Sequence, residues 1–345
     1  MTRVLSRADL NRTVLARQML MERSSSPLHR AVERMAGVQT QYAPSAYIGL
    51  WSRIEGFARR DLTDALERRS LIQATVMRGT IHIVSRGDFW PLVEASRPPR
   101  QDGWIRAWGR SHDLDEVMRL STEVRRLLAD APMKRKAIVD SLGIDSETWN
   151  GIVNWVDLVR VPPSGTWDSR RADLYWLASS WVGPNHADLE TGRDLLVRRY
   201  LTGFGPATRQ DIQAFTLMSL AEIDESLSRV RTRRFRSEDG DDLWDVPGAA
   251  VVDGEAPAPV RFIGNWDAIL LIHCRRSGVL PEEHRPQIFN IRAPHSSATF
   301  LIDGRVRGSW SEEGGRVVLD RFEPIPRRFS RELTDERSQL EAFLR

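Results

Sequence analysis

A pair of helices followed by a β-hairpin recurs along the chain, and this pattern restricts the fold more than any other feature of the sequence. Residues 6–23 and 27–37 are predicted to be helices, and two further helical stretches begin after Pro44 and at Arg60. Residues 71–84 are then rich in β-branched side chains, which predicts two short strands. Helices followed by a small hairpin are typical of a winged helix-turn-helix unit.

The same order of elements appears twice more. Residues 131–158 are predicted to form two helices, and residues 159–178 a strand, a turn and a returning strand. Residues 205–230 contain another helix pair, and the hairpin after them is expected to turn at Asp239 and Gly240. The simplest interpretation is three tandem winged helix-turn-helix units.

The chain after residue 250 has a different pattern. Residues 298–310 predict a hairpin that turns at Asp303 and Gly304, and a strand and an amphipathic helix complete the sequence. We therefore expect a helix-rich α+β protein. Its expected parts are winged unit 1 (residues 1–100), winged unit 2 (residues 101–190), winged unit 3 (residues 191–250) and a C-terminal α+β element (residues 251–345).

Arginine dominates the basic residues. Of the 50 basic residues only Lys134 and Lys136 are lysines, while the formal net charge is +3. Arginine recognises phosphates and base edges because its guanidinium donates hydrogen bonds in pairs, but a GC-rich genome would also raise its frequency. A net charge this small means that any basic patch must be local.

The candidate DNA contacts lie on the predicted hairpins or near them. They are Arg78 and His82 on the first hairpin, Arg233, Arg234 and Arg236 on the third, Arg305 and Arg307 beside the last turn, and His284. For the arginines the alternative is a solvated strand edge, where charge discourages aggregation. For the two histidines a structural imidazole is an equal alternative.

Several classes of chemistry are disfavoured. Cys274 is the only cysteine, so an internal disulfide and a thiolate metal cluster are excluded. The sequence contains no HExxH motif, no Walker loop and no GxGxxG after a strand, so we expect no metal and no cofactor. It also lacks the roughly 20 apolar residues of a membrane helix and the apolar core of a signal peptide, so we expect a cytoplasmic protein.

Gln39 and Gln41 follow the second predicted helix, with Thr40 between them. Alone, two amides after a helix end fit a loop that makes backbone hydrogen bonds. Together with four further stretches they resemble the winged-helix DNA glycosylases of the AlkZ/YcaQ type, over about residues 5–345. These stretches are MRGTIHIV (77–84), YLTGFGPATRQDI (200–212), GNWDAILL (264–271) and FLIDGRVRGSW (300–310).

The resemblance implies three winged helices around a concave channel for double-stranded DNA. It also implies removal of bulky alkylated purines, including interstrand crosslinks, and the branch it indicates contains self-resistance enzymes of genotoxin producers. Gln39 and Gln41 match a catalytic motif of glutamine, an aliphatic residue and glutamine. Thr40 departs from the motif, although its volume is close to that of valine. By analogy, the hairpin of residues 298–310 is expected to probe a DNA groove.

Alkylation at N7 places positive charge on a purine and makes it a good leaving group. Two neutral amides can then suffice to orient the attacking water. Neither lysine is near the motif in sequence, so a Schiff-base lyase step is not expected. We expect a monomeric, monofunctional glycosylase without an obligate protein partner. The competing class is a non-enzymatic winged-helix regulator or a drug-sequestering protein.

Overall fold

The computed structural model describes residues 3–271, 276–290 and 295–345. The fold is α+β and rich in helices, as predicted, with short sheets that join groups of helices. Cys274 and the neighbouring His273 lie outside the described residues.

The first group of elements surrounds the two glutamines. It comprises β1 (Val4–Leu5), α1 (Arg7–Arg17), α2 (Leu28–Arg34), β2 (Val38–Gln39), α3 (Ala43–Trp51), α4 (Arg59–Glu67), β3 (Leu71–Thr75), a 3₁₀ turn (Met77–Gly79) and β4 (Ile81–Ser85). A capping box starts α1, because Ser6 and Asp9 each accept the other's backbone N–H with their side chains, at 3.0 and 2.9 Å. The helix ends at Arg17, earlier than predicted, and the backbone becomes left-handed at Met19 (φ 57°).

The second group begins with a long helix. It comprises α5 (Arg86–Trp108), α6 (Leu114–Leu127), β5 (Met133–Lys134), α7 (Arg135–Leu142), α8 (Ser146–Ile152), β6 (Leu158–Arg160), β7 (Leu174–Leu177) and α9 (Ala178–Trp181). As predicted, Gly143 separates α7 from α8, and its φ of 64° is one that glycine adopts without strain. Helix α5 runs through residues 100 and 101, so the predicted boundary there does not separate two units.

The hairpins of these two groups form one sheet. Its six strands have the order β2-β4-β3-β6-β7-β5, and Gln73 on β3 pairs with Arg160 on β6. Each hairpin is short, and the two pair edge to edge through β3 and β6. The first two units are therefore continuous through their sheet, whereas the sequence predicted separate wings.

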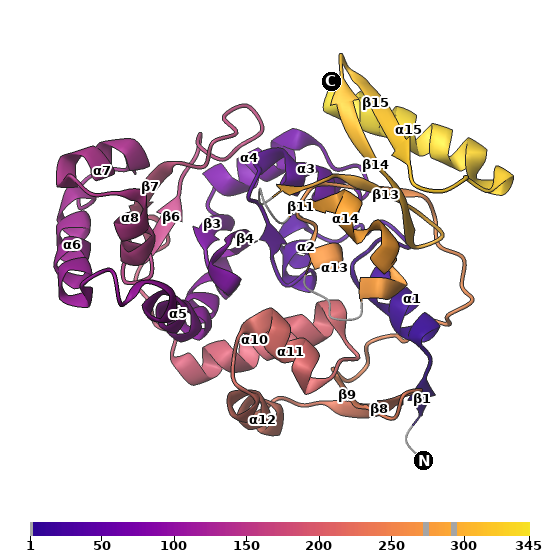
Figure 1. Cartoon of the computed structure of the whole chain (residues 1–345), viewed down its shortest axis with the longest axis horizontal. Helices are drawn as coiled ribbons and strands as arrows, with labels where there is room; N and C mark the ends of the chain where they lie inside the picture. The colour runs from indigo at the N-terminus through magenta and orange to yellow at the C-terminus, as the bar shows by residue number, and fades with distance from the viewer. Residues whose placement is uncertain (1–2, 272–275, 291–294) are drawn as a thin grey trace.

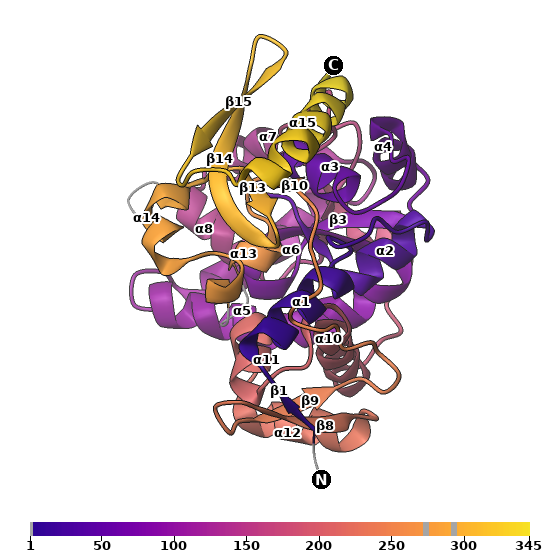
Figure 2. The ribbon, with the colours of Figure 1, turned by 90° about the vertical axis from the view of Figure 1, so that its right-hand side faces the viewer.

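The third group carries its own hairpin. It comprises α10 (Leu189–Phe204), α11 (Arg209–Thr216), α12 (Leu220–Arg229), β8 (Arg233–Ser237) and β9 (Asp242–Asp245). Gly240 has a φ of 89° at the predicted turn, but the boundary predicted between residues 190 and 191 falls inside α10. The N-terminal strand β1 joins this hairpin in parallel, with Val4 opposite Arg236, as Figure 2 shows near the N-terminus.

The C-terminal group contains a four-stranded antiparallel sheet of order β10-β13-β14-β15. Its elements are β10 (Arg261–Ile263), α13 (Ala268–Leu271), two 3₁₀ turns (Arg276–Gly278 and Glu282–His284), α14 (Arg285–Ile288), β11 (Phe289–Asn290), β12 (His295–Ser296), β13 (Thr299–Ile302), β14 (Arg305–Glu313), β15 (Arg316–Arg321), a 3₁₀ turn (Arg327–Phe329) and α15 (Ser330–Leu344). The predicted turn is confirmed, since Asp303 and Gly304 both have positive φ, 49° and 72°.

These groups surround a central region. In Figure 1, α6 to α8 form a lobe at the left, α10 to α12 lie below, and β13 to β15 with α15 lie at the upper right. The strands β3 and β4 lie between the left lobe and the rest of the chain. Within the described ranges, every helix is too short or too polar to cross a membrane.

Candidate active site

Gln39 belongs to a strand, and Gln41 lies in the bend that follows it. Gln39 ends β2, the edge strand of the six-stranded sheet, and pairs with His82 on β4. The backbone stays paired beyond it, because the N–H of Thr40 donates to Ile81 O at 2.8 Å. The chain bends at Gln41, which is exposed, whereas Gln39 and Thr40 are buried. Thr40 is buried, as the aliphatic residue of the motif would be.

Gln39 is held by an arginine and opposed by a histidine. Arg78 Nη2 donates to Gln39 Oε1 at 3.1 Å and lies 3.0 Å from His82 Nε2. His82 Nδ1 lies 3.0 Å from the carbonyl oxygen of Thr80, so we assign the ring proton to Nδ1 and leave Nε2 as an acceptor. Burial, and then the charge of Arg78, lower the pKa of His82 to about 3, so the ring is neutral.

Arg78 occupies a constrained position in the 3₁₀ turn between β3 and β4. Its φ of 55° is left-handed, which is uncommon for a residue with a side chain. The guanidinium lies 4.8 Å from the ring centroid of Phe215 on α11, and burial lowers its pKa to about 10. The turn therefore connects the glutamine strand to the third group of helices.

Gln41 lies at a large cavity and is exposed to solvent. Its Oε1 accepts the N–H of Ile81 at 2.9 Å, so its amide is also oriented by a donor. The cavity has a volume of about 930 Å³ and lies where the six-stranded sheet meets α5, α7 and α8. Six basic residues and one acidic residue line it: Arg78, Arg100, Arg135, Lys136, Arg160, Arg171 and Asp173.

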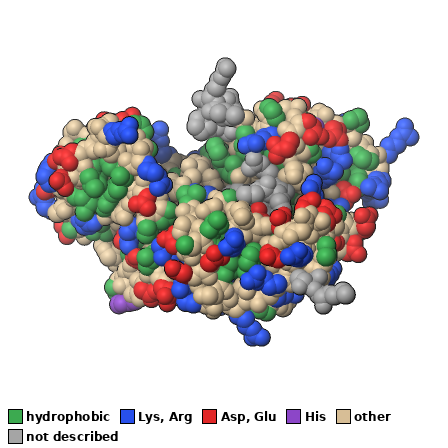
Figure 3. All heavy atoms as spheres, turned by 60° about the horizontal axis from the view of Figure 1, so that its bottom comes forward, with side chains coloured by type: hydrophobic (Ala, Val, Ile, Leu, Met, Phe, Trp, Pro, Cys, Tyr) green, Lys and Arg blue, Asp and Glu red, His purple; other side chains and the backbone are tan. Residues whose placement is uncertain are grey.

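Two of these arginines are buried without a carboxylate partner among the described residues. Arg100 donates to the carbonyl oxygen of Thr75, and burial lowers its pKa to about 10. Arg160 donates to Thr75 Oγ1 and to the hydroxyl of Tyr175, each at 2.9 Å. Neutral acceptors leave their positive charges uncompensated, and a polyanion such as DNA would balance them. The face of the molecule in Figure 3 instead mixes basic and acidic side chains.

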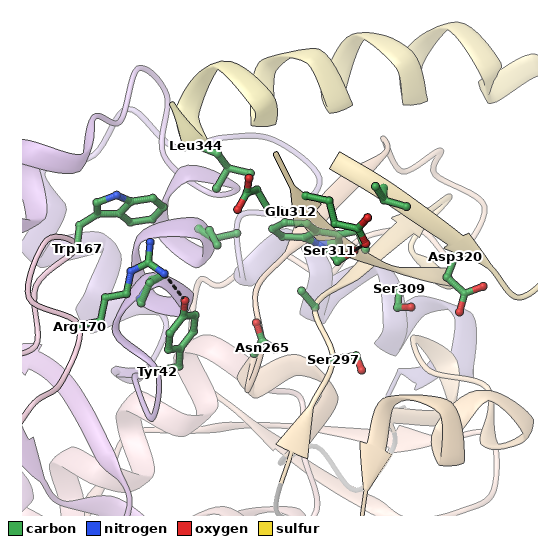
Figure 4. Close-up of a pocket in the computed structure, with 16 residues that line it drawn as sticks. Tyr42, Trp167, Arg170, Asn265, Ser297, Ser309, Ser311, Glu312, Asp320 and Leu344 are labelled. Atoms are coloured by element: carbon green, nitrogen blue, oxygen red, sulfur yellow. Dashed lines mark hydrogen bonds between the residues drawn. The ribbon is translucent and has the colours of Figure 1, made fainter. Parts of the chain in front are cut away.

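A second cleft, of about 610 Å³, lies between α3, the loop before β7 and the C-terminal sheet. Figure 4 shows Trp167 and Arg170 on one side of it and residues of β14 on the other, with Arg170 donating to the hydroxyl of Tyr42 at 2.8 Å. The carboxylates of Glu312, Glu313 and Asp320 also line this cleft, and they disfavour a polyanion. The basic cavity beside Gln41 is therefore the candidate active site.

The chain matches a known protein family over most of its length. Residues 32–343 match the family described as DNA glycosylase AlkZ-like. The chain belongs to this family. It is therefore a DNA glycosylase, and its substrate is DNA.

The fold of an AlkZ-like glycosylase is also evident in three dimensions. The structure of the Streptomyces sahachiroi DNA glycosylase AlkZ matches with a TM-score of 0.80, over 99% of this chain and 97% of that chain. Sequence identity is 20%, so the match establishes a shared fold. No curated protein is significantly similar to this chain in sequence.

In this AlkZ-like chain the histidines proposed as DNA contacts are buried. His82 faces Gln39 and Arg78, as described above, and is 2% exposed. His284 is 6% exposed, and its Nε2 lies 2.7 Å from Glu323 Oε1. The structure thus places both imidazoles in internal networks, where they are not presented to a phosphate.

The arginines proposed on the later hairpins divide into two kinds. Arg233 is paired with the fully buried Asp245, which also binds Arg17, and Arg307 is paired with Glu323. These two are structural ion pairs. Of the other three, Arg234 and Arg305 are exposed and remain candidate DNA contacts. Arg236 is also exposed, 3.5 Å from Asp242.

The turn of the expected DNA-probing hairpin is not a free tip. Arg12 on α1 donates to the carbonyl oxygen and the carboxylate of Asp303 at 2.8 and 2.7 Å. A side chain at Gly304 would collide with Arg12 and Leu15, so the turn packs tightly on α1. The hairpin that projects is the following one, between β14 and β15, which turns at Gly314 and Gly315 (Figure 2).

Two groups of side chains have the composition of a metal site. They are His112, Asp145 and Glu147, and Glu283, His284 and Glu323. In the first group Asp145 caps α8 by accepting the N–H of Thr148 at 2.7 Å, and in the second Glu323 is bound to Arg307 and His284. Neither group lines the basic cavity.

The sequence did not reveal which residues of the segment from α5 to α9 line the cavity. The signal that existed was a single arginine, Arg160, in the apolar stretch LVRV (158–161). A charge at that place in a strand indicates a partner or a function, but it does not say which other residues it will meet.

Proposed function

We propose that this chain hydrolyses the N-glycosidic bond of bulky N7-alkylated purines, including interstrand crosslinks, and that Gln39 and Gln41 position the water. The observation that carries the proposal is the fixed orientation of both amides, each by a protein donor to its oxygen, with Gln41 lining a basic cavity. A carbonyl oxygen has two lone pairs, and a protein donor occupies one on each glutamine. We propose that the second lone pair of each oxygen accepts a hydrogen bond from the water.

The proposed reaction needs little acid or base assistance. The bond between C1′ and the base nitrogen breaks with its electron pair moving to the base, which neutralises the positive charge that alkylation placed there. The sugar becomes an oxocarbenium ion, and the oxygen of the water attacks C1′ and loses a proton to solvent. The products are the free base and an abasic site. Oriented amide dipoles favour this reaction by positioning the water and by stabilising the developing positive charge.

The shape of the cavity supports a bulky substrate. It lies between the sheet and the helices of the second group and is open to solvent on one side, as Gln41 shows by its exposure. A crosslinked base cannot rotate fully out of the duplex, so an open cavity suits it better than a closed pocket.

The direct test is base release by the variant Gln39→Ala/Gln41→Ala. On a duplex with one N7-alkylated guanine, wild-type protein should yield free base and an alkali-labile abasic site, and the variant should yield neither at matched DNA occupancy. Gln339→Ala replaces an exposed glutamine on α15 and serves as the control. Base release by the double variant would overturn the catalytic assignment. Sequence-specific binding by the wild type without any release would instead support a regulator.

A further inference from the structure

Arg78 is oriented toward the protein rather than toward the cavity. Both hydrogens of Nη2 are committed, one to Gln39 Oε1 and one to His82 Nε2. Nη1 is buried and has no hydrogen-bond partner among the described residues. A phosphate therefore cannot reach the paired donors of this guanidinium, although Arg78 contributes to the cavity lining.

We propose that Arg78 is a positioning residue that acts through Gln39, by holding the amide with Oε1 toward the guanidinium and so fixing where Gln39 can bind the water. This inference rests on the proposed role of Gln39. A glutamine amide has two faces that differ only in an oxygen and an NH₂ group, and rotation about the last bond exchanges them. A guanidinium has donors and no acceptor, so it accommodates only the oxygen.

Two contacts and a constrained backbone hold Arg78 in place for this task. His82 Nε2 accepts the second hydrogen of Nη2, which requires the neutral form of the ring that its burial imposes. Phe215 packs against the guanidinium at 4.8 Å. The backbone at Arg78 is left-handed, and residues are held in such conformations where the surroundings enforce them.

The benefit of Arg78 is geometric, not electrostatic. A fixed positive charge beside the reacting sugar disfavours an oxocarbenium ion, so charge alone would slow the reaction. The orientation of Gln39 compensates for this cost, because small displacements of a positioning group reduce rates strongly. Removal of Arg78 should therefore reduce the rate of base release and leave DNA affinity nearly unchanged.

The test is a double-mutant cycle on single-turnover base release. Arg78→Met keeps the packing on Phe215 and removes the donors, and it should slow release about 10- to 100-fold with the dissociation constant for DNA changed less than about twofold. In the Gln39→Ala background the same substitution should slow base release by less than about a further twofold, since both residues act through one amide. Arg171→Ala, an exposed arginine of the same cavity, should combine multiplicatively with Gln39→Ala.

Chemical rescue gives a second readout. Millimolar guanidinium should restore release by Arg78→Ala several-fold over an equal concentration of sodium chloride, and should not restore Gln39→Ala. Multiplicative losses in the cycle, or weaker DNA binding with an unchanged rate, would overturn this inference alone. An absence of base release by the wild-type protein would overturn the proposed function and this inference together.

Discussion

Gln39 and His82 lie directly opposite each other on neighbouring strands, and one nitrogen of Arg78 bridges them at 3.1 and 3.0 Å. The bridge exists only while His82 is neutral, because a protonated imidazole has no lone pair to accept from Arg78. The orientation of a proposed catalytic amide thus depends on the protonation state of a buried histidine.

The stability of the protein should fall as pH decreases below the ordinary pKa of histidine. In the folded chain the pKa of His82 is lowered from 6.5 to about 3 by burial and by Arg78, so between these values the unfolded chain binds one more proton. Unfolding is then favoured by up to about 1.4 kcal/mol per pH unit as pH falls through this window, and the contribution is fully present above pH 6.5. Thermal unfolding from pH 7.5 to 5.0 measures the slope.

His82→Gln should reduce that slope, because glutamine does not titrate and can still accept from Arg78. His29→Gln is the matched control, since His29 is exposed on α2. Equal pH slopes in the wild type and His82→Gln would show that His82 is not the source of the pH dependence.

Thr40→Val should stabilise the protein. Thr40 is 1% exposed, and its hydroxyl has no hydrogen-bond partner among the described residues. Replacing that hydroxyl by a methyl group removes a buried unpaired polar atom, so we expect a gain of about 1 kcal/mol, seen as a higher melting temperature.

Thr13→Val is the matched control and should have the opposite sign. Thr13 is equally buried, but its Oγ1 accepts the N–H of Val252 at 2.9 Å. Removal of that acceptor leaves the N–H unpaired at a cost of about 1–3 kcal/mol. A lower melting temperature for Thr40→Val would show that the hydroxyl has a partner.

Arg135 and Arg171 should contribute to DNA affinity without sequence preference. Both line the basic cavity, and neither has a carboxylate within 4.0 Å among the described residues. Replacing each by alanine should weaken binding and lower the slope of log affinity against log salt by about 0.9 per phosphate contact. Fluorescence anisotropy at several salt concentrations measures this, with Arg119→Ala, an arginine paired with Glu116 on α6, as the control.

Base release should proceed without a covalent enzyme–DNA intermediate. Lys136 lines the cavity despite its distance from the glutamines in sequence, but its Nζ is 2.6 Å from Asp140 Oδ2. Borohydride added during the reaction should therefore trap no protein–DNA adduct, with a lyase-proficient glycosylase as the positive control. An adduct that disappears in Lys136→Ala would establish a Schiff-base step.

Local features were predicted well from the sequence where one residue controls the backbone. Gly143, Gly240 and the Asp303–Gly304 pair each adopt positive φ at the turns expected of them. The ends of elements were predicted less well. The first helix stops at Arg17, and α5 continues past residue 100, because packing and chain direction rather than local propensity decide where an element ends.

The sequence alone indicated the order of helices and hairpins, the family, and the glutamine pair that we propose to be catalytic. Each of these depends on neighbouring residues or on a short motif. The tertiary structure decided which donors orient the two amide oxygens and which cations line the cavity beside Gln41. Arg78 meets Gln39 across 39 residues, and Arg160 meets Thr75 across 85. The first contact depends on the pairing of β2 with β4, and the second depends on how the first two hairpins join into one sheet. Edge-strand pairing leaves no local signal in the sequence.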